Sequence, residues 1–151
     1  EEITDPRQLL LIRIAALFHD TGFLFEYSGH EARSCVIMRE ALEGTSISSE
    51  EMEQISGMIM ATKIPQSPTN LMEQIICDAD LDYLGREDFP PISNNLKKEF
   101  LEYGVIKSEA AWDPLQIGFL EKHQYFTQTS NKTRAPKKNE YLAILKEEQN
   151  H

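Results

Sequence analysis

Two adjacent residues, His19 and Asp20, end an apolar stretch in which Arg13 is the only charge between positions 9 and 18. An imidazole and a carboxylate both suit a hard or borderline divalent cation. Neighbouring side chains on a helix point roughly 100° apart, so adjacent ligands at a helix end can reach one ion from two directions. The pair alone is weak evidence, because a satisfied core histidine beside a helix-end aspartate occurs without a metal.

A second candidate region further along the chain holds three acids, Asp78, Asp80 and Asp82. On a helix, Asp78 and Asp82 share one side, and we expect them to be solvated. Asp80 instead lies in line with the apolar residues Ile76 and Leu84. A carboxylate on an apolar side needs a compensating partner, because burying a bare charge is costly. A bound metal ion is one such partner.

The stretches ALFHDTGF and CDADLDYLGR together resemble the HD superfamily of metal-dependent phosphohydrolases, and most of all its small predicted phosphohydrolases. Relatives include hydrolases of signalling nucleotides and cyclic-nucleotide phosphodiesterases. The resemblance covers roughly residues 7–127. It implies a helical domain that uses one divalent metal ion (Mn, Mg, Fe, Co or Zn) to hydrolyse a phosphate ester of a nucleotide or another small phosphorylated metabolite.

The resemblance also implies roles for individual residues. His19, Asp20 and Asp80 match the metal ligands of the family, and Asp78 is the nearest alternative to Asp80. The family's first metal-binding histidine lies on a preceding helix, whereas no histidine precedes His19 here. We therefore expect either a domain that is incomplete at its N-terminus or a degenerate one.

Three further residues, His30, Glu31 and Lys63, are candidates for the catalytic site. His30 opens a helix, where related domains often carry a histidine that binds a second metal or a phosphate; the alternative is a surface histidine near a turn. Glu31 either complements the helix dipole or carries a proton. Lys63 follows a helix end and either complements the dipole there or reaches a substrate phosphate. Arg33 either joins Lys63 in holding phosphate or is solvated. Relatives that bind two metals often have histidine near this point of the chain. Lys63 stands there instead, which favours one metal.

The composition fits a single soluble domain of 151 residues, with 40% hydrophobic and 26% charged residues. The net charge of −10 disfavours a nucleic acid polymer as a partner, because phosphate binding needs a basic face. Cys35 and Cys77 are too few for a disulfide framework and are expected as reduced core thiols. The apolar run is too short to span a bilayer and no basic region precedes it. We therefore expect a cytoplasmic protein with a small phosphorylated substrate and no membrane partner, and leave a homodimer open.

Caps, prolines and glycines predict an all-α, single-domain bundle of about six to seven helices within residues 1–151. Asp5 and Pro6 begin the first helix, and its apolar character nearly all round predicts a central position. The expected helices cover about 6–20, 30–42, 49–61, 71–84, 93–103, 114–127 and 139–148. The polar stretch 128–138 is expected to be an exposed loop, and it carries a basic cluster of Lys132, Arg134, Lys137 and Lys138.

Two other functions stay open at this point. The chain could be a catalytically inactive HD-like module that binds a nucleotide and regulates a partner, as a domain lacking the first histidine would be. It could also be a plain helical interaction domain whose acids are solvated. Metal analysis separates the last function from the other two, and a phosphatase assay with Mn²⁺ separates the enzyme from the binder.

Overall fold

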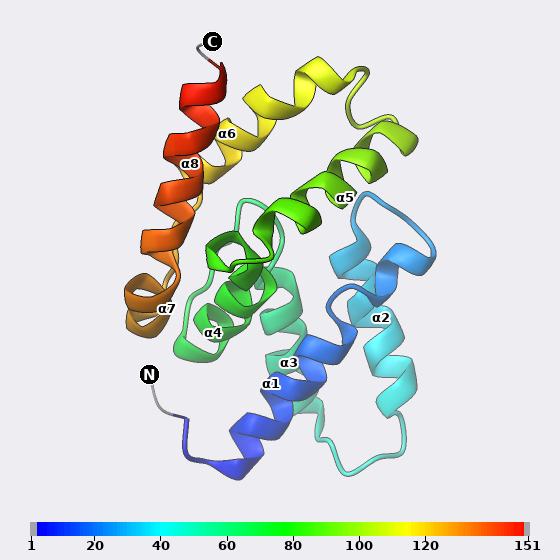
Figure 1. Cartoon of the computed structure of the whole chain (residues 1–151). Coiled ribbons are helices and arrows are strands. Elements are labelled where there is room, and N and C mark those ends of the chain that lie inside the picture. The colour runs from blue at the N-terminus through cyan, green and yellow to red at the C-terminus, as the bar shows by residue number, and fades with distance from the viewer. Residues whose placement is uncertain (1–2, 150–151) are drawn as a thin grey trace. The chain divides into compact units, whose positions relative to one another are not determined.

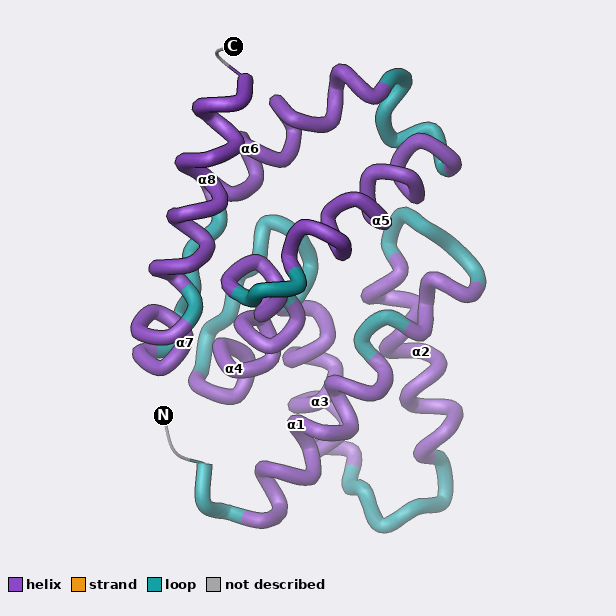
Figure 2. Tube along the Cα trace, viewed as in Figure 1, coloured by secondary structure: helices purple, strands orange, loops and turns teal. Residues whose placement is uncertain are grey.

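The computed structural model describes residues 3–149, and the regular structure within them is entirely helical, as Figure 2 shows. These residues form eight α-helices and three short 3-10 helices, which confirms the all-α prediction. The chain divides into two compact units, of which the first ends at Asp80 and the second begins at Leu81. Over the same residues, none of the helices has the length and apolar character needed to cross a membrane.

The first unit contains four α-helices, which are labelled in Figure 1, and one 3-10 helix. They are α1 (Pro6–Phe18), η1 (Thr21–Leu24), α2 (His30–Leu42), α3 (Ser49–Ala61) and α4 (Leu71–Asp80). Their common core is built from aliphatic and methionine side chains, namely Leu11, Ala15, Met38, Ile55, Met58, Ile59 and Ile76. Burying such side chains is the main favourable contribution to folding.

The helix starts of this unit follow the capping signals in the sequence. The Asp5 side chain accepts a hydrogen bond from the backbone N–H of Arg7 at the start of α1. Ser48 and Glu51 form a reciprocal capping box at α3. The predicted position of α1, however, is only partly right. Leu11 and Ala15 are buried, but the Leu17 side chain is 73% exposed, because only one side of α1 packs onto the core.

The second unit contains four α-helices and two 3-10 helices. They are η2 (Asp82–Gly85), α5 (Phe89–Glu102), η3 (Glu109–Ala111), α6 (Trp112–Lys122), α7 (Gln128–Thr133) and α8 (Ala135–Gln149). Leu81, Leu84, Phe89 and Leu120 form a core cluster here. α5 starts earlier than predicted, with Pro90 and Pro91 in its first turn. Proline is tolerated there because first-turn N–H groups have no partner within the helix.

The loop predicted over 128–138 is wrong. Thr127 caps α7 by accepting a hydrogen bond from the backbone N–H of Ser130, and α8 begins at Ala135, so the predicted terminal helix 139–148 starts a turn earlier. The Lys138 side chain, expected in a solvated cluster, is only 6% exposed. Its Nζ donates to the carbonyls of Leu120 and His123 at the end of α6, where a lysine both satisfies unpaired carbonyls and complements the helix dipole.

Candidate metal site

His19, Asp20 and Asp80 come together within the first unit. His19 is the C-cap of α1, Asp20 follows it, and Asp80 is the last residue of α4. The Nε2 atom of His19 lies 3.2 Å from Asp20 Oδ2 and 3.2 Å from Asp80 Oδ1. One ligand atom from each of the three residues falls within 4.8 Å of the other two. These separations suit three ligands of one ion, because metal–ligand bonds of about 2.0–2.6 Å place ligand atoms a few ångströms apart.

The hydrogen bond on the other ring nitrogen of His19 determines what Nε2 can do. Nδ1 lies 2.8 Å from the carbonyl oxygen of Ala16. A carbonyl oxygen only accepts, so Nδ1 carries the hydrogen, and in the neutral ring Nε2 presents its lone pair. That lone pair faces two carboxylate oxygens, an arrangement that is repulsive unless a cation lies between them. Histidine ligands of metals usually donate their second N–H to a carbonyl or carboxylate in this way.

Without a metal, a proton can supply the missing positive charge. Hydrogen bonds to Asp20 and then to Asp80 raise the pKa of His19 to about 10. For Asp20, partial burial raises the pKa, but the hydrogen bond and charge of His19 outweigh that effect and the net pKa is lowered. The group therefore has a strong preference for positive charge at the centre of its three side chains.

Ser34, on α2, holds the main chain on both sides of Asp20. Its hydroxyl donates to the carbonyl oxygen of His19 at 2.7 Å and accepts from the backbone N–H of Gly22 at 2.8 Å. The Ser34 side chain is fully buried, at 0% exposure. These two bonds fix the turn between α1 and η1, and so they position the Asp20 carboxylate.

Gly22 is required by close packing between η1 and α2. A Cβ atom at Gly22 would lie 1.9 Å from the carbonyl oxygen of His30, which is a backbone atom that no side-chain rotation can move away. The absence of a side chain at Gly22 lets the start of α2 approach the turn after Asp20. His30, the first residue of α2, is thereby brought next to the group.

His30 and Glu31 extend the group at the start of α2. His30 Nε2 lies 3.6 Å from Asp20 Oδ1 and 3.5 Å from Glu31 Oε1. Its Nδ1 lies 3.2 Å from the carbonyl oxygen of Tyr27, and its ring stacks on Phe23 with centroids 3.6 Å apart. Glu31 is 7% exposed. Of the two predicted candidates, His30 therefore lies within reach of Asp20, and Glu31 lies beside His30.

Lys63 and Asp78 are not part of this group. Lys63 is exposed just beyond α3, and within residues 3–149 no contact joins its side chain to the group. Asp78 is 3% exposed, so the expectation that it is solvated was wrong, because the side of α4 that carries it faces the interior. The set that converges in the described residues contains Asp80 rather than Asp78.

The two cysteines are free thiols, as the sequence predicted. Burial, together with the charges of Asp80 and Asp78, raises the pKa of Cys77 to about 12. The Cys77 thiol donates to the carbonyl oxygen of Ala61 at 3.1 Å. Its sulfur is therefore held in the protonated form, beside the carboxylates rather than among the candidate ligands.

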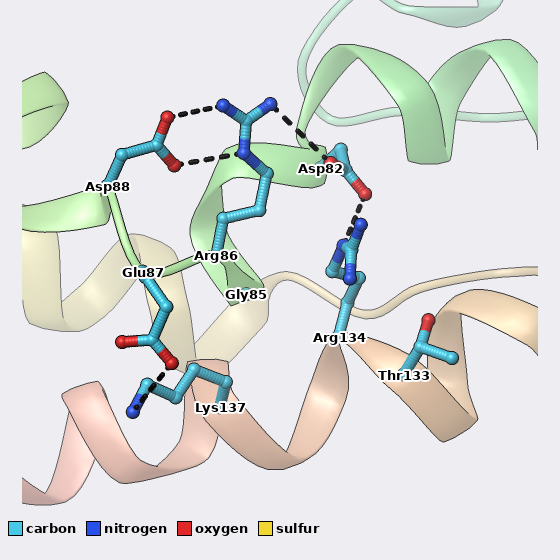
Figure 3. Close-up of a pocket in the computed structure, with 8 residues that line it drawn as sticks. All are labelled: Asp82, Gly85, Arg86, Glu87, Asp88, Thr133, Arg134 and Lys137. Carbon is cyan, nitrogen blue, oxygen red and sulfur yellow. Dashed lines mark hydrogen bonds and ion pairs between the residues drawn. The ribbon is translucent and has the colours of Figure 1, made fainter.

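A second charged cluster lies within the second unit and lines a surface pocket, which Figure 3 shows. Its acids are Asp82, Glu87 and Asp88, and its cations are Arg86, Arg134 and Lys137. Arg134 Nε lies 2.6 Å from Asp82 Oδ1, and Arg86 binds Asp88 through two nitrogens. Lys137 Nζ lies 3.4 Å from Glu87 Oε1. Arg134 and Lys137, two residues of the predicted basic cluster, are thus paired with acids rather than free in solution.

Comparison of the chain with models of known protein families, with curated proteins and with solved structures found no match. The argument for function therefore depends on the geometry of the first unit. Sequence reasoning found the three converging residues, but it missed the positions of Ser34 and Phe23. A buried serine that bridges two backbone groups leaves no periodic signal, because its partners depend on how α2 packs.

Proposed function

We propose that the chain is a metal-dependent phosphohydrolase that resembles the HD superfamily, with His19, Asp20 and Asp80 as the ligands of one divalent metal ion. The observation that carries this proposal is the position of His19 Nε2, which lies 3.2 Å from a carboxylate oxygen of Asp20 and 3.2 Å from one of Asp80. One imidazole and two carboxylates favour Mn²⁺, Fe²⁺, Co²⁺ or Mg²⁺, and they also bind Zn²⁺.

When bound, a divalent metal supplies Lewis-acid polarisation of a phosphoryl oxygen and lowers the pKa of water. The residues of the chain provide the rest of the site. Asp20, in the turn after α1, and Asp80, at the end of α4, would hold the metal together with His19, while Ser34 keeps the backbone around Asp20 in place. His30 lies beside Asp20 and can give a proton to the leaving oxygen, and Glu31 orients its Nε2.

Arg33 is the candidate that offsets negative charge on the phosphate. Its guanidinium carbon lies 4.7 Å from the centre of the Phe25 ring. Within residues 3–149 no carboxylate is paired with it. Lys63, the other cation expected to hold phosphate, is less suited, because it makes no described contact with the group.

The test is hydrolysis of p-nitrophenyl phosphate and of a cyclic nucleotide with Mn²⁺ and with EDTA. We expect activity only with the metal, and a loss of about a hundredfold or more in Asp80→Asn, because even the residues that support metal ligands contribute about 10- to 100-fold. Asp82→Asn is the matched control, since it removes an acid of the second cluster. Metal binding without hydrolysis of either substrate would favour the regulatory, inactive module instead.

A further inference from the structure

An exposed apolar surface adjoins the candidate metal site. We call it the apolar rim, and it consists of Leu17, Phe23, Leu24 and Phe25. Their side chains are 73%, 43%, 81% and 65% exposed. Single exposed apolar residues are ordinary, but four of them between positions 17 and 25, on both sides of a candidate ligand, point to a binding surface.

The rim flanks Asp20 along the chain, and Phe23 joins it to the candidate ligands through His30. Leu24 and Phe23 lie in η1, which follows Asp20 immediately, and Leu17 lies about one helical turn before Asp20. Phe23 stacks on His30, whose Nε2 is 3.6 Å from Asp20 Oδ1. A molecule that reaches Asp20 from solvent therefore meets apolar side chains on the same part of the first unit.

The rim also contains one positive group. The Arg33 guanidinium lies over the Phe25 ring, at 4.7 Å from its centre, as in a cation–π contact. The ligand that matches this surface has an anionic head for Arg33 and the metal site, and an apolar body for the leucines and phenylalanines. A sugar or polyol would fit poorly, because its hydroxyl groups lose hydrogen bonds to water against apolar side chains.

We propose that this site selects phosphate esters of apolar alcohols, with an alkyl or aryl leaving group that lies on the rim. The proposal rests on the phosphohydrolase function proposed above. In the reaction, the oxygen of water bonds to phosphorus as the bond between phosphorus and the alcohol oxygen breaks. The alcohol oxygen takes up a proton, and the products are the free alcohol and inorganic phosphate.

The test is calorimetric titration of ethyl-, butyl- and hexylphosphonate into the Mn²⁺-loaded protein. Partial burial of the chain on the rim should raise affinity by about twofold per methylene, roughly half the effect of full burial. Leu24→Asn should flatten this dependence without affecting folding, since Leu24 is 81% exposed. Ile144→Asn, an exposed position in the second unit, is the matched control and should keep the wild-type dependence.

Any of three results would overturn the proposal. They are equal affinity for the three phosphonates, no binding of any of them, and the same dependence of affinity on chain length in wild type and Leu24→Asn. Hydrolysis of the matching alkyl phosphates separates this failure from failure of the proposed function. Turnover without a chain-length preference rejects the rim and keeps the phosphohydrolase. Affinity that rises with chain length, without turnover of any ester, supports the rim as a ligand surface and rejects the phosphohydrolase.

Discussion

The two charged clusters differ in how their negative charge is balanced. In the first unit, the carboxylates of Asp20 and Asp80 face the imidazole of His19, and Asp20 also lies 3.6 Å from the imidazole of His30. In the second unit, three acids face the charged side chains of two arginines and a lysine (Figure 3). A cluster that already contains its counter-charges gains little from a metal, whereas carboxylates that face only titratable rings leave room for a cation. Acidic residues alone are therefore a poor sign of a metal site, and the identity of their partners decides the matter.

The largest expected effect comes from the two tightly packed glycines, one beside each cluster. In Gly22→Ala, Cβ would lie 1.9 Å from His30 O, and in Gly85→Ala it would lie 2.4 Å from Arg134 O. We expect each to lower the free energy of unfolding by about 3 kcal/mol or more, as overpacking against backbone does. Denaturant unfolding measures this loss. Only Gly22→Ala should also reduce the thermal stabilisation by Mn²⁺. A larger reduction in Gly85→Ala would contradict the claim that the metal binds at the first cluster rather than at the second.

A smaller effect is expected from two buried serines. Ser34→Ala removes the bridge between His19 and Gly22, and Ser93→Ala removes the acceptor of Gln116 Nε2 in the second unit. Each should reduce the free energy of unfolding by about 1–3 kcal/mol, because a buried polar group loses its partner.

The two serine variants should separate when metal is added. Ser34→Ala should weaken the Mn²⁺-induced rise in melting temperature, since Asp20 is then held less firmly. Ser93→Ala should show the full rise. Equal responses of the two variants would mean that Ser34 only stabilises the fold.

The second cluster should respond to salt rather than to metal. Arg134→Gln removes the 2.6 Å pair with Asp82, in which both side chains are partly exposed. We expect a loss of less than about 1 kcal/mol in unfolding free energy at low ionic strength, and a smaller loss in concentrated NaCl. Urea denaturation at two salt concentrations measures it. A loss that is independent of salt would mean that packing of the arginine, rather than its charge, is what matters.

The smallest expected effect concerns an exposed ion pair of the first unit. Hydrogen bonds from Arg7 and from the backbone of Ser48 lower the pKa of Glu51 to about 2. The pair therefore stabilises the fold above the ordinary glutamate pKa of 4.5, and this contribution is lost as the pH falls towards 2. In Glu51→Gln, melting temperature should fall less steeply over this range than in wild type. If melting temperature falls equally steeply with pH in the two proteins, the pair contributes nothing to stability.

The sequence predicted the helical class and the candidate ligands better than it predicted their setting. His19, Asp20 and Asp80 could be expected together because the two motifs that contain them resemble one family's pattern of metal ligands. The bridge from Ser34 and the stacking of Phe23 on His30 could not, because they depend on how close Gly22 lets α2 approach.

Charge and polarity misled the prediction elsewhere. The stretch 128–138 looks like a loop, yet it forms α7 and the start of α8, because Thr127 provides a cap and Lys138 satisfies carbonyls at the end of α6. Asp78 looked solvated but is buried. The polarity of a short stretch does not show whether its polar side chains find partners elsewhere in the fold.

The central claim is that one cation binds between His19, Asp20 and Asp80. The most direct measurement is calorimetric titration of Mn²⁺ into wild type, Asp80→Asn and Asp82→Asn. The account predicts one equivalent bound by wild type and by Asp82→Asn, and affinity weaker by on the order of a hundredfold in Asp80→Asn, because a ligand matters at least as much as a supporting residue. No binding by wild type, or equal binding by wild type and Asp80→Asn, would contradict it.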